Sequence, residues 1–303
     1  MKTISLSLML LFLLNVASGQ TLSVKDFYFS APLFINPAMA GESDDPTLTL
    51  ISHLPSSGVD GAPASATFSY DQHLKKINSG IGAAMSRETL GVHSGWRYTL
   101  MYNYRWKFSG GNELALGSSF FYIRQESDFS KLGIYGGSSL LAGVVRSNYF
   151  SYDLGASYSF FKGTKAGLSF VNYPYNYREN FSDDFSEIKD RRKLFAFIQQ
   201  DFRLSKWLKL TPSALYALPG ELSAILNLNA TAYIGKWAFV GAQYSNNNSL
   251  NNTSNVFAGL CYNDAIQIGV KVFKKQTQML AYGYRSAAFM LQVSPKRKDK
   301  SKD

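Results

Sequence analysis

The chain lacks the paired cysteines of disulfide-bonded exported domains and, after its first residues, the long apolar runs of helical membrane proteins. Its single cysteine, Cys261, cannot form an intrachain disulfide, and its small neighbours Ala258 and Gly259 are typical of a packed wall rather than of a nucleophile. Only 17% of the residues are charged. After residue 19, no run of about 18 apolar residues occurs that would make a membrane helix. Any membrane crossing must therefore use strands that close into a barrel.

Residues that carry catalysis or hold metals are also scarce. The three histidines, His53, His73 and His93, lie in no nucleophile-elbow, zinc-helix or cysteine-pair pattern. A hydrolase with serine and histidine at a barrel rim would need His93-Ser94, which is ordinary loop composition. The pair Asp183-Asp184 matches no calcium-loop spacing and is typical of a solvated loop. We therefore expect no catalytic residue, metal ligand or cofactor.

The first residues indicate export. Met1-Lys2 is a short positive start, residues 4–14 are an apolar run too short to span a bilayer, and Ala17-Ser18-Gly19 is a small-residue cleavage site. The alternative is a buried first helix of a soluble domain, but polar Gln20 follows the small residues at once. Residues 1–19 are thus predicted to be a signal peptide.

The net charge of +10 is a weak indication of nucleic-acid binding. Exported proteins rarely meet nucleic acid, and much of the basic excess lies in turns and in the tail at residues 295–303. We expect no nucleic acid among the partners.

Two segments alternate between apolar and polar residues with a period of two. In residues 96–108 the even positions are apolar or aromatic, and residues 222–234 repeat this pattern. Both runs suit a tilted membrane strand of roughly 9–11 residues. The alternative, a soluble sandwich or lipocalin-like barrel, would place the apolar face in a core. Aromatic residues suited to interfacial girdles near strand ends are Trp96, Trp106, Trp207, Trp237 and Phe289.

Tight and long connections mostly alternate along the chain. Tight ones are expected near residues 75–78, 110–112, 162–164, 205–206, 235–236 and 263–264, and long ones near 54–64, 87–95, 125–149, 172–192, 245–255 and 275–286. A shorter turn at Pro219-Gly220 interrupts the pattern. The predicted fold is all-β, a transmembrane antiparallel barrel of about 14 strands with short periplasmic turns and longer extracellular loops. Its expected parts are a periplasmic segment or plug at 20–46, the barrel at 47–294 and a basic periplasmic tail at 295–303.

A recognisable motif follows the expected signal peptide. Residues 26–41 read DFYFSAPLFINPAMAG, an aromatic-rich run that leads to Asn-Pro-Ala-x-Ala-Gly. This segment resembles the opening of the PorP/SprF family of type IX secretion system membrane proteins. Shorter similarities follow in the family's order at residues 61–63, 67–71, 79–82, 102–105, 117–122, 128–132 and 210–216. After His53 the family usually has Arg-Asn-Gln-Trp, but this chain has residues Leu54-Pro55-Ser56-Ser57, so any family contact through that loop is in doubt here.

The motif has a physical interpretation. Asn36-Pro37 predicts an extended turn with one backbone donor removed, Ala38 and Ala40 permit close packing, and Gly41 lets the chain bend toward a first strand near Thr47. Two roles stay open at this point, closure of the periplasmic mouth and contact with a partner. The motif residues expected to serve either role are Phe34, Asn36, Pro37, Ala38, Ala40 and Gly41.

The resemblance implies binding rather than turnover. It implies an accessory barrel in the outer membrane of a Gram-negative bacterium, surrounded by outer-membrane lipid and in contact with other type IX secretion components. Its clients would be secreted proteins, including gliding adhesins, held through their C-terminal domains. The alternative is a passive porin or small-solute transporter with a polar lumen formed by Arg97, Asn103, Arg105 and Lys107.

Loops on a rigid barrel are where binding residues gather, so the long connections 125–149 and 172–192 are the expected docking face. Aromatic residues there would supply buried contact area, and charged ones would set orientation. The candidate partner-binding residues are Tyr135, Tyr149, Tyr173, Tyr175, Tyr177, Arg178, Asp183 and Asp184.

Overall fold

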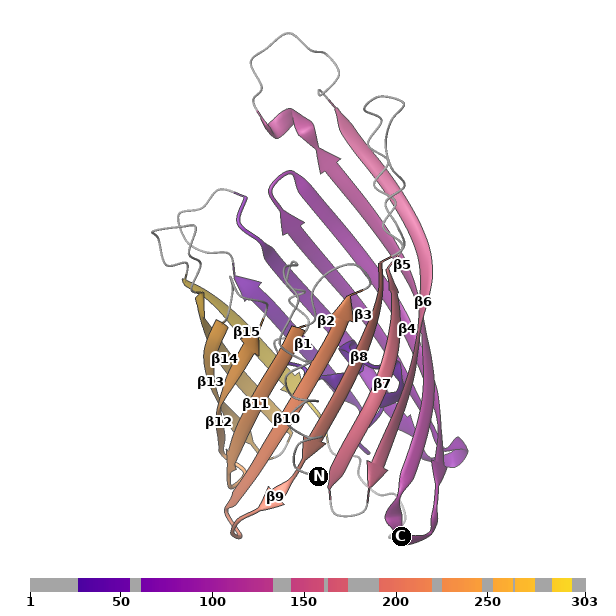
Figure 1. The fold of residues 1–303 in the computed structure, drawn as a ribbon, viewed down its shortest axis with the longest axis vertical. Helices are drawn as coiled ribbons and strands as arrows, with labels where there is room; N and C mark the ends of the chain where they lie inside the picture. The colour runs from indigo at the N-terminus through magenta and orange to yellow at the C-terminus, as the bar shows by residue number, and fades with distance from the viewer. Residues whose placement is uncertain are drawn as a thin grey trace, which may run out of the picture.

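The strands form one antiparallel barrel (Figure 1). The computed structural model describes residues 27–54, 61–132, 143–160, 163–173, 191–219, 225–246, 253–263, 265–275 and 285–295. The barrel closes where β15 pairs with β1, for example Leu50 with Leu291. The strands are β1 (Thr47–Leu54), β2 (Ala64–Leu74), β3 (Ser79–Leu90), β4 (His93–Lys107), β5 (Glu113–Asp128), β6 (Val144–Phe160), β7 (Thr164–Tyr173), β8 (Arg191–Gln200), β9 (Phe202–Arg203), β10 (Leu208–Pro219), β11 (Ile225–Ile234), β12 (Ala238–Asn246), β13 (Thr253–Tyr262), β14 (Ile266–Lys275) and β15 (Arg285–Val293).

The predicted fold class is confirmed. Within the described residues, fourteen long strands build the wall, and the two-residue β9 pairs only with the lower end of β10. None of the helices in the described residues is both long and apolar enough to cross a membrane.

The predicted alternation of the two faces is also confirmed. In β11 the side chain of Asn227 is 3% exposed and faces the lumen, whereas that of Leu228 is 45% exposed and faces outward. In β4, Leu100 faces outward and Met101 inward. Because side chains on a strand alternate strictly, a period-two pattern identifies the lipid-facing set without any tertiary information.

Three of the expected girdle aromatics lie where a membrane interface should be. Trp106, Trp207 and Trp237 are exposed at the tight-turn end of the barrel, and Trp96 lies on the upper part of β4. The placement of Phe289 at a strand end is wrong, because it lies in the middle of β15, opposite Ser52 and Val270.

Two predicted long loops are partly or wholly strand. β3 and β4 leave only Gly91 and Val92 between them, so the loop expected at 87–95 is a tight hairpin. Gly91 has φ +58°, a conformation that favours glycine and suits a two-residue hairpin turn. Similarly, β5 and β6 extend to Asp128 and Val144 and occupy both ends of the loop expected at 125–149. Residues 87–89 and 125–128 are polar on both faces of these strands, so their sequence looks like loop.

The extra length of these strands forms a raised wall, which we define as the upper parts of β3 to β6 at residues 85–90, 93–98, 122–128 and 144–150. Figure 1 shows these strands standing higher than the rest of the barrel, with the hairpin of β5 and β6 highest. The connection that follows Pro219 does not interrupt the alternation of the two ends of the barrel, contrary to the prediction from the sequence. β10 ends at Pro219 and β11 begins at Ile225, so this connection lies at the loop end, where the alternation requires it.

The last described residues, Ser294 and Pro295, follow β15 at the tight-turn end. The basic tail from residue 296 onward lies outside the described residues, and its periplasmic location stays a prediction.

A test of the lipid-facing set is best made on β6. Leu154 is 50% exposed and lies four residues from both Tyr158 below and Phe150 above, near the middle of the apolar band. We expect Leu154→Arg to cost about 2–4 kcal/mol, because a cation meets hydrocarbon there, and Asn148→Arg on the same face to cost about 0–1 kcal/mol. Urea titration of heat-modifiable migration measures both. Equal costs would show that the depth assignment is wrong.

Leu226, the position first suggested by the sequence for such a charge, is the second residue of β11 and lies near its upper end. Its neighbour Asn227 is buried and accepts a hydrogen bond from the Ser245 hydroxyl. A charged side chain in place of Asn227 would therefore be buried rather than solvated in an open lumen.

Candidate functional site: the seat of the N-terminal segment

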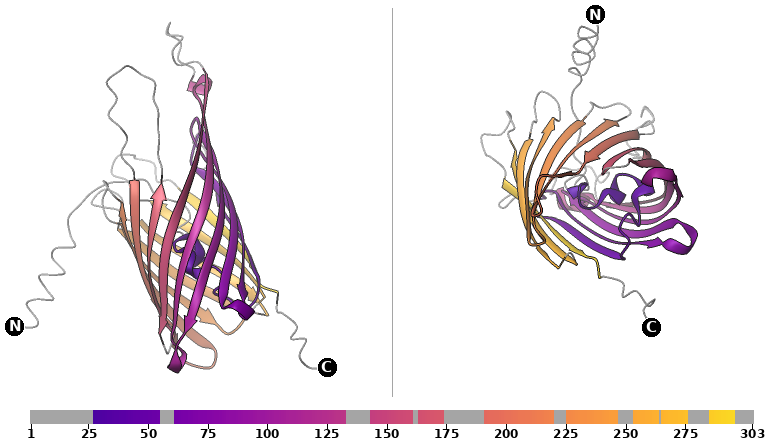
Figure 2. Two further views of the ribbon diagram at one scale, coloured as in Figure 1. Left: turned by 90° about the vertical axis from the view of Figure 1, so that its right-hand side faces the viewer. Right: turned by 90° about the horizontal axis from the view of Figure 1, so that it is seen from below.

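Residues 27–41 lie inside the barrel, where the view from below shows them within the ring of strands (Figure 2). The segment forms two short 3₁₀ helices, η3 (Pro32–Phe34) and η4 (Pro37–Met39). Each begins with a proline, which fixes φ at a helical value and lacks an N–H that would be unsatisfied at that position. Asn36 caps η4, because its side-chain oxygen accepts a hydrogen bond from the Ala38 amide at 2.9 Å.

A row of lumen-facing residues forms the seat for this segment. Gly80, Asn103, Gly117, Gly155 and Ser169 are consecutive cross-strand neighbours on β3 to β7. We call these five residues the seat row. Its members are either glycine or a side chain that hydrogen-bonds to the segment, so the backbone of residues 35–40 can approach the wall closely.

The glycines of the seat row leave no room for a side chain. A Cβ at Gly80 would overlap the carbonyl oxygen of Ala40, and one at Gly155 would overlap the side chain of Asn36. At Gly117 a Cβ would lie 2.6 Å from the Ala38 nitrogen. Close backbone approach therefore requires glycine at these positions.

Asn36 joins the segment to two barrel strands. Its Nδ2 donates to the carbonyl oxygens of Ala156 at 2.9 Å and Leu168 at 3.1 Å, on β6 and β7. The side chain is 1% exposed. The amide nitrogen of Asn36 thus makes both hydrogen bonds to the wall, while the side-chain oxygen accepts from the Ala38 N–H. Only a side-chain amide can donate twice and accept once in this way.

Asn103 and Arg105, on β4, hold the other end of η4. The Asn103 Nδ2 donates to the carbonyl oxygens of Pro37 at 3.2 Å and Ala40 at 2.7 Å. Arg105 donates to the same Ala40 oxygen at 2.8 Å and forms an ion pair with Glu113 at 2.8 Å. These polar side chains satisfy the carbonyls at the end of the short helix.

The segment leaves its seat at Gly41, at the tight-turn end of the lumen. Gly41 has φ +65° and its amide donates to the Asp71 carboxylate at 2.8 Å. Asp44 then contacts Lys75 and His73, each at 3.2 Å. Hydrogen bonding to Lys75, and secondarily to His73, holds the pKa of the Asp44 carboxyl below its ordinary value. Contacts with charged residues therefore hold the chain in place where the segment leads into β1.

Aromatic residues anchor the other end of the segment. Phe27 and Phe29 pack against Phe239 and Phe257 of β12 and β13, with the rings of Phe29 and Phe257 stacked at 4.6 Å. Tyr28 points to a neighbouring part of the wall, where its hydroxyl hydrogen-bonds with Ser213 of β10 at 3.0 Å. Burial raises the pKa of Tyr28 to about 12, so it stays protonated and able to form this bond at neutral pH.

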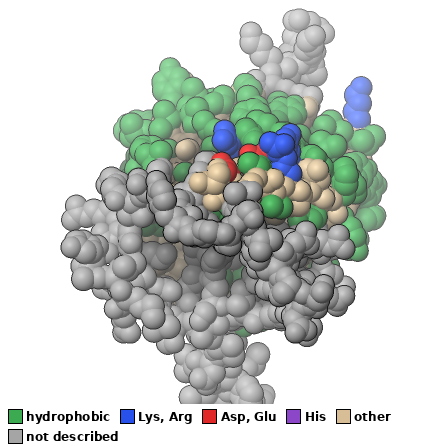
Figure 3. Space-filling view, turned by 90° about the horizontal axis from the view of Figure 1, so that it is seen from above, with side chains coloured by type: hydrophobic (Ala, Val, Ile, Leu, Met, Phe, Trp, Pro, Cys, Tyr) green, Lys and Arg blue, Asp and Glu red, His purple; other side chains and the backbone are tan. Residues whose placement is uncertain are grey.

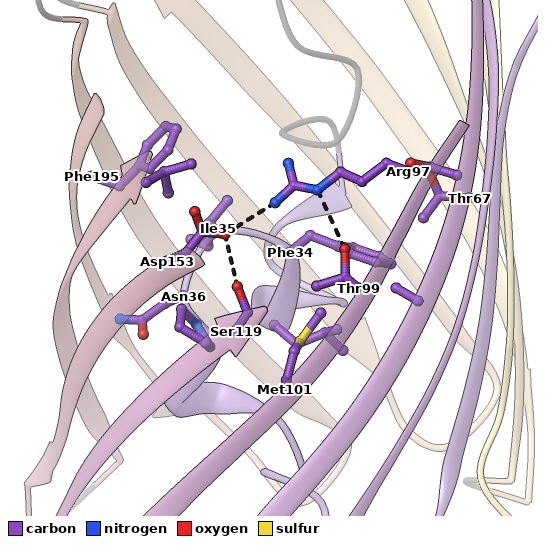
Figure 4. A pocket seen from close by; sticks show the side chains of 15 residues that line it. Phe34, Ile35, Asn36, Thr67, Arg97, Thr99, Met101, Ser119, Asp153 and Phe195 are labelled. Carbon is purple, nitrogen blue, oxygen red and sulfur yellow. Dashed lines mark hydrogen bonds and ion pairs between the residues drawn. The ribbon is translucent and has the colours of Figure 1, made fainter. Parts of the chain in front are cut away.

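A small cavity of about 60 Å³ lies between the segment and the wall (Figure 4). On the wall side, Arg97 forms an ion pair with Asp153 at 3.0 Å, and the Ser119 hydroxyl donates to the same carboxylate at 2.9 Å. Phe34 and Ile35 line the opposite side. A carboxylate that is already paired in this way leaves the cavity with little free charge for a ligand.

Four of the motif residues predicted from the sequence occupy the seat directly. Asn36, Ala38 and Ala40 contact the seat row or its partners, and Gly41 bonds to Asp71. Pro37 begins η4, and Phe34 packs against both the Leu33 and the Phe27 clusters. The sequence did not identify the seat itself, because its five members lie on five strands.

The candidate docking residues are not brought together by the described structure. Tyr149 lies within β6, opposite Ile123, and not in a loop. Tyr173 is the last residue of β7, where it pairs with Arg191. The others, Tyr135, Tyr175, Tyr177, Arg178, Asp183 and Asp184, lie outside the described residues.

The four polar residues that the sequence predicts to line a porin lumen do not face an open channel. Asn103 and Arg105 bond to the segment and Arg97 bonds to Asp153, while Lys107 is exposed at the lower end of β4. The His93-Ser94 pair also fails as a dyad, because adjacent residues of a strand face opposite sides and His93 bonds instead to Ser127 at 2.7 Å. Among the described residues no cluster of potential metal ligands occurs.

The closed strand order, the lipid-facing set and the filled lumen define an outer-membrane β-barrel. Similar solved structures include the CymD monoaromatic hydrocarbon channel, with a TM-score of 0.56 and 11% identity over 88% of this chain and 93% of that one. The Pseudomonas putida toluene transporter TodX has a TM-score of 0.51 at 10% identity, over 87% of this chain and 93% of TodX. Acinetobacter baumannii Omp33 has a TM-score of 0.50 at 8% identity, over 83% of this chain and 98% of Omp33. At such identities the likeness concerns the fold alone.

The sequence identifies the family. Residues 17–294 match the family described as type IX secretion system membrane protein PorP/SprF, and the chain belongs to it. Among curated proteins no sequence matches the chain significantly. The protein is therefore an outer-membrane component of the type IX secretion system, a class whose family and fold are of non-enzymatic types.

Proposed function

We propose that this protein is an accessory barrel that holds secreted proteins at the cell surface through their C-terminal domains and performs no catalysis. The observation that supports this most directly is the filled lumen. The segment at residues 27–41 hydrogen-bonds to β4, β6 and β7 through its second half and packs the aromatic side chains of residues 27–29 against other strands of the barrel. A barrel occupied in this way is suited to present a rigid surface and poorly suited to conduct solutes.

The two ends of the barrel would serve different partners. The long connections are the proposed docking face for an exported domain. They leave from the same end of the barrel as the raised wall. Seen from that end, basic and acidic side chains gather amid hydrophobic ones on the described surface (Figure 3). At the other end, the side chain of Asp44 is largely exposed beside the tight turns, and other secretion or gliding components would meet the protein there.

The rival function is a passive porin or small-solute transporter, and planar-bilayer conductance separates the two. We expect the intact protein to give no stable channels, because residues 27–41 occupy the lumen. Deletion of residues 27–41 is expected to open a conductance. Steady ohmic channels from the intact protein would contradict the proposal and favour the porin. If the deletion variant does not fold, Asn36→Asp, argued below, provides the same comparison.

The proposed docking face is tested by a loop deletion. Because Arg191 and Arg192 pair with β7, the deletion must stop before them, and residues 176–190 are the appropriate segment. We propose that Tyr177, Arg178, Asp183 and Asp184 contact the client there, and that Tyr135 and Tyr175 belong to the same docking face. The expected result is an assembled barrel, measured by membrane fractionation, that no longer retains a secreted adhesin at the surface, measured by immunolabelling.

The control for this deletion removes residues 277–283 from the connection between β14 and β15, at the same end of the barrel. This variant is expected to retain the adhesin. Normal adhesin display by an assembled 176–190 deletion would exclude that connection as the docking face. Attention would then move to the segment at residues 27–41.

A further inference from the structure

The outer face of β4, β5 and β6 carries a clearly bounded apolar band. Two outward-facing cross-strand rows limit it, and on each strand they are eight residues apart. With a rise of about 3.4 Å per residue and a tilt of about 40°, this spacing is about 21 Å, close to the roughly 25 Å of a membrane-barrel apolar band. The lower row is Trp106, Leu114 and Tyr158, and the upper row is Tyr98, Tyr122 and Phe150.

The outward-facing residues between these rows carry no charge. The upper row is aromatic throughout, and its rings contact one another, with Tyr98 and Tyr122 at 6.3 Å and Tyr122 and Phe150 at 4.9 Å between centroids. Such a row marks the membrane interface on the loop side. The uncharged residues between the rows are Leu100, Tyr102, Tyr104, Leu116, Ser118, Phe120, Tyr152, Leu154 and Ala156.

The next outward row, directly above this interface, contains two arginines. Arg87, Trp96, Arg124 and Asn148 are consecutive cross-strand neighbours on β3 to β6. The Arg87 guanidinium lies 5.2 Å from the centre of the Trp96 ring, and Arg87, Arg124 and Asn148 are exposed. We call these four residues the arginine row.

The arginine row carries unbalanced positive charge. Among the described residues, neither Arg87 nor Arg124 forms an ion pair. The nearest outward carboxylate, Glu126, lies one row higher and is paired with Arg146 at 2.9 Å. Two guanidinium groups therefore flank an interfacial tryptophan at the boundary between hydrocarbon and headgroups, and in the described part of the chain no carboxylate pairs with them.

We propose that the arginine row binds the phosphorylated sugar headgroup of a lipid A-type glycolipid in the outer leaflet. Guanidinium groups bind phosphate oxygens in a bidentate geometry, and Trp96 offers an amphipathic ring at headgroup level. The acyl chains would lie along the aromatic upper row beneath. The inference is independent of the docking function proposed above, because it concerns the lipid-facing side of the raised wall and needs no client.

The test uses the full-length protein purified in detergent and the variant Arg87→Gln/Arg124→Gln. Binding of phosphorylated lipid A is measured by native mass spectrometry, beside chemically dephosphorylated lipid A and with inorganic phosphate as competitor. The matched control is Arg203→Gln/Lys206→Gln, which removes two exposed cations at the opposite, tight-turn end. Heat-modifiable migration confirms that all variants are folded, since substitution of exposed arginines by glutamine should leave the barrel intact.

We expect the double variant of the arginine row to bind phosphorylated lipid A roughly tenfold or more weakly, whereas the control variant binds like the natural protein. Dephosphorylated lipid A should bind the natural protein as weakly as phosphorylated lipid A binds the variant. Equal affinity of the natural protein and the arginine-row variant would overturn the proposal, as would equal binding of the two lipids. Displacement of the lipid by inorganic phosphate at matched concentration would assign the site to a free anion instead.

Discussion

Gly80→Ala is expected to displace the N-terminal segment from the lumen. The added Cβ would overlap the Ala40 carbonyl oxygen, which is backbone and is already held by Asn103 and Arg105. Neither the β3 wall nor the bonded carbonyl can move without breaking other hydrogen bonds. Overpacking of this kind costs about 1–3 kcal/mol or more, which is enough to shift a segment held by a few hydrogen bonds.

Chymotrypsin cleavage provides the measurement, because the aromatic residues Phe27, Tyr28 and Phe29 are buried when the segment is seated. The natural protein should resist cleavage there, and Gly80→Ala should be cut, with the products identified by mass spectrometry. Gly95→Ala is the matched control, since a Cβ at this strand glycine would meet its nearest atom, the Arg124 oxygen, at an ordinary 3.6 Å. If both variants resist equally, the close approach at Gly80 does not hold the segment.

Asn36→Asp is expected to open the barrel in a pH-dependent manner. The substitution replaces the Nδ2 donor with an oxygen that faces the carbonyl oxygens of Ala156 and Leu168. The other carboxylate oxygen can still accept from the Ala38 amide. A buried carboxylate with one oxygen that lacks a donor costs about 3 kcal/mol or more, whereas Asn36→Ala removes the hydrogen bonds without adding charge and should cost about 1–2 kcal/mol. The aspartate variant should therefore be the more severe of the two, although it is closer in shape to asparagine.

The pH dependence follows from the direction of the expected shift. Burial against carbonyl oxygens raises the pKa of the new aspartate, so the folded state favours its protonated form. The defect should then diminish as the pH falls from about 8 to about 5, because a protonated carboxyl can donate one hydrogen bond. Planar-bilayer conductance at both pH values is the measurement, with Asn36→Ala as the pH-independent control. Equal conductance of the two variants at both values would mean that Asn36 acts through its volume alone.

Several properties of this protein are contained in the sequence. The lipid-facing set follows from the period-two alternation, because a strand places successive side chains on opposite faces whatever surrounds it. The barrel follows from this alternation over strands long enough to cross a membrane. The family is identified by the match over residues 17–294, and Pro37 and Gly41 of the motif already indicate a compact turn.

The tertiary structure alone decided where strands end and what the motif contacts. The polar hairpin ends above the lipid-facing rows, such as residues 125–128, look like loop in sequence, because both of their faces are polar. The seat row joins Gly80, Asn103, Gly117, Gly155 and Ser169, and nothing local distinguishes these glycines from Gly95, which has space for a side chain. Their alignment is a product of the barrel's register across five strands, and register depends on pairings between residues far apart in the chain.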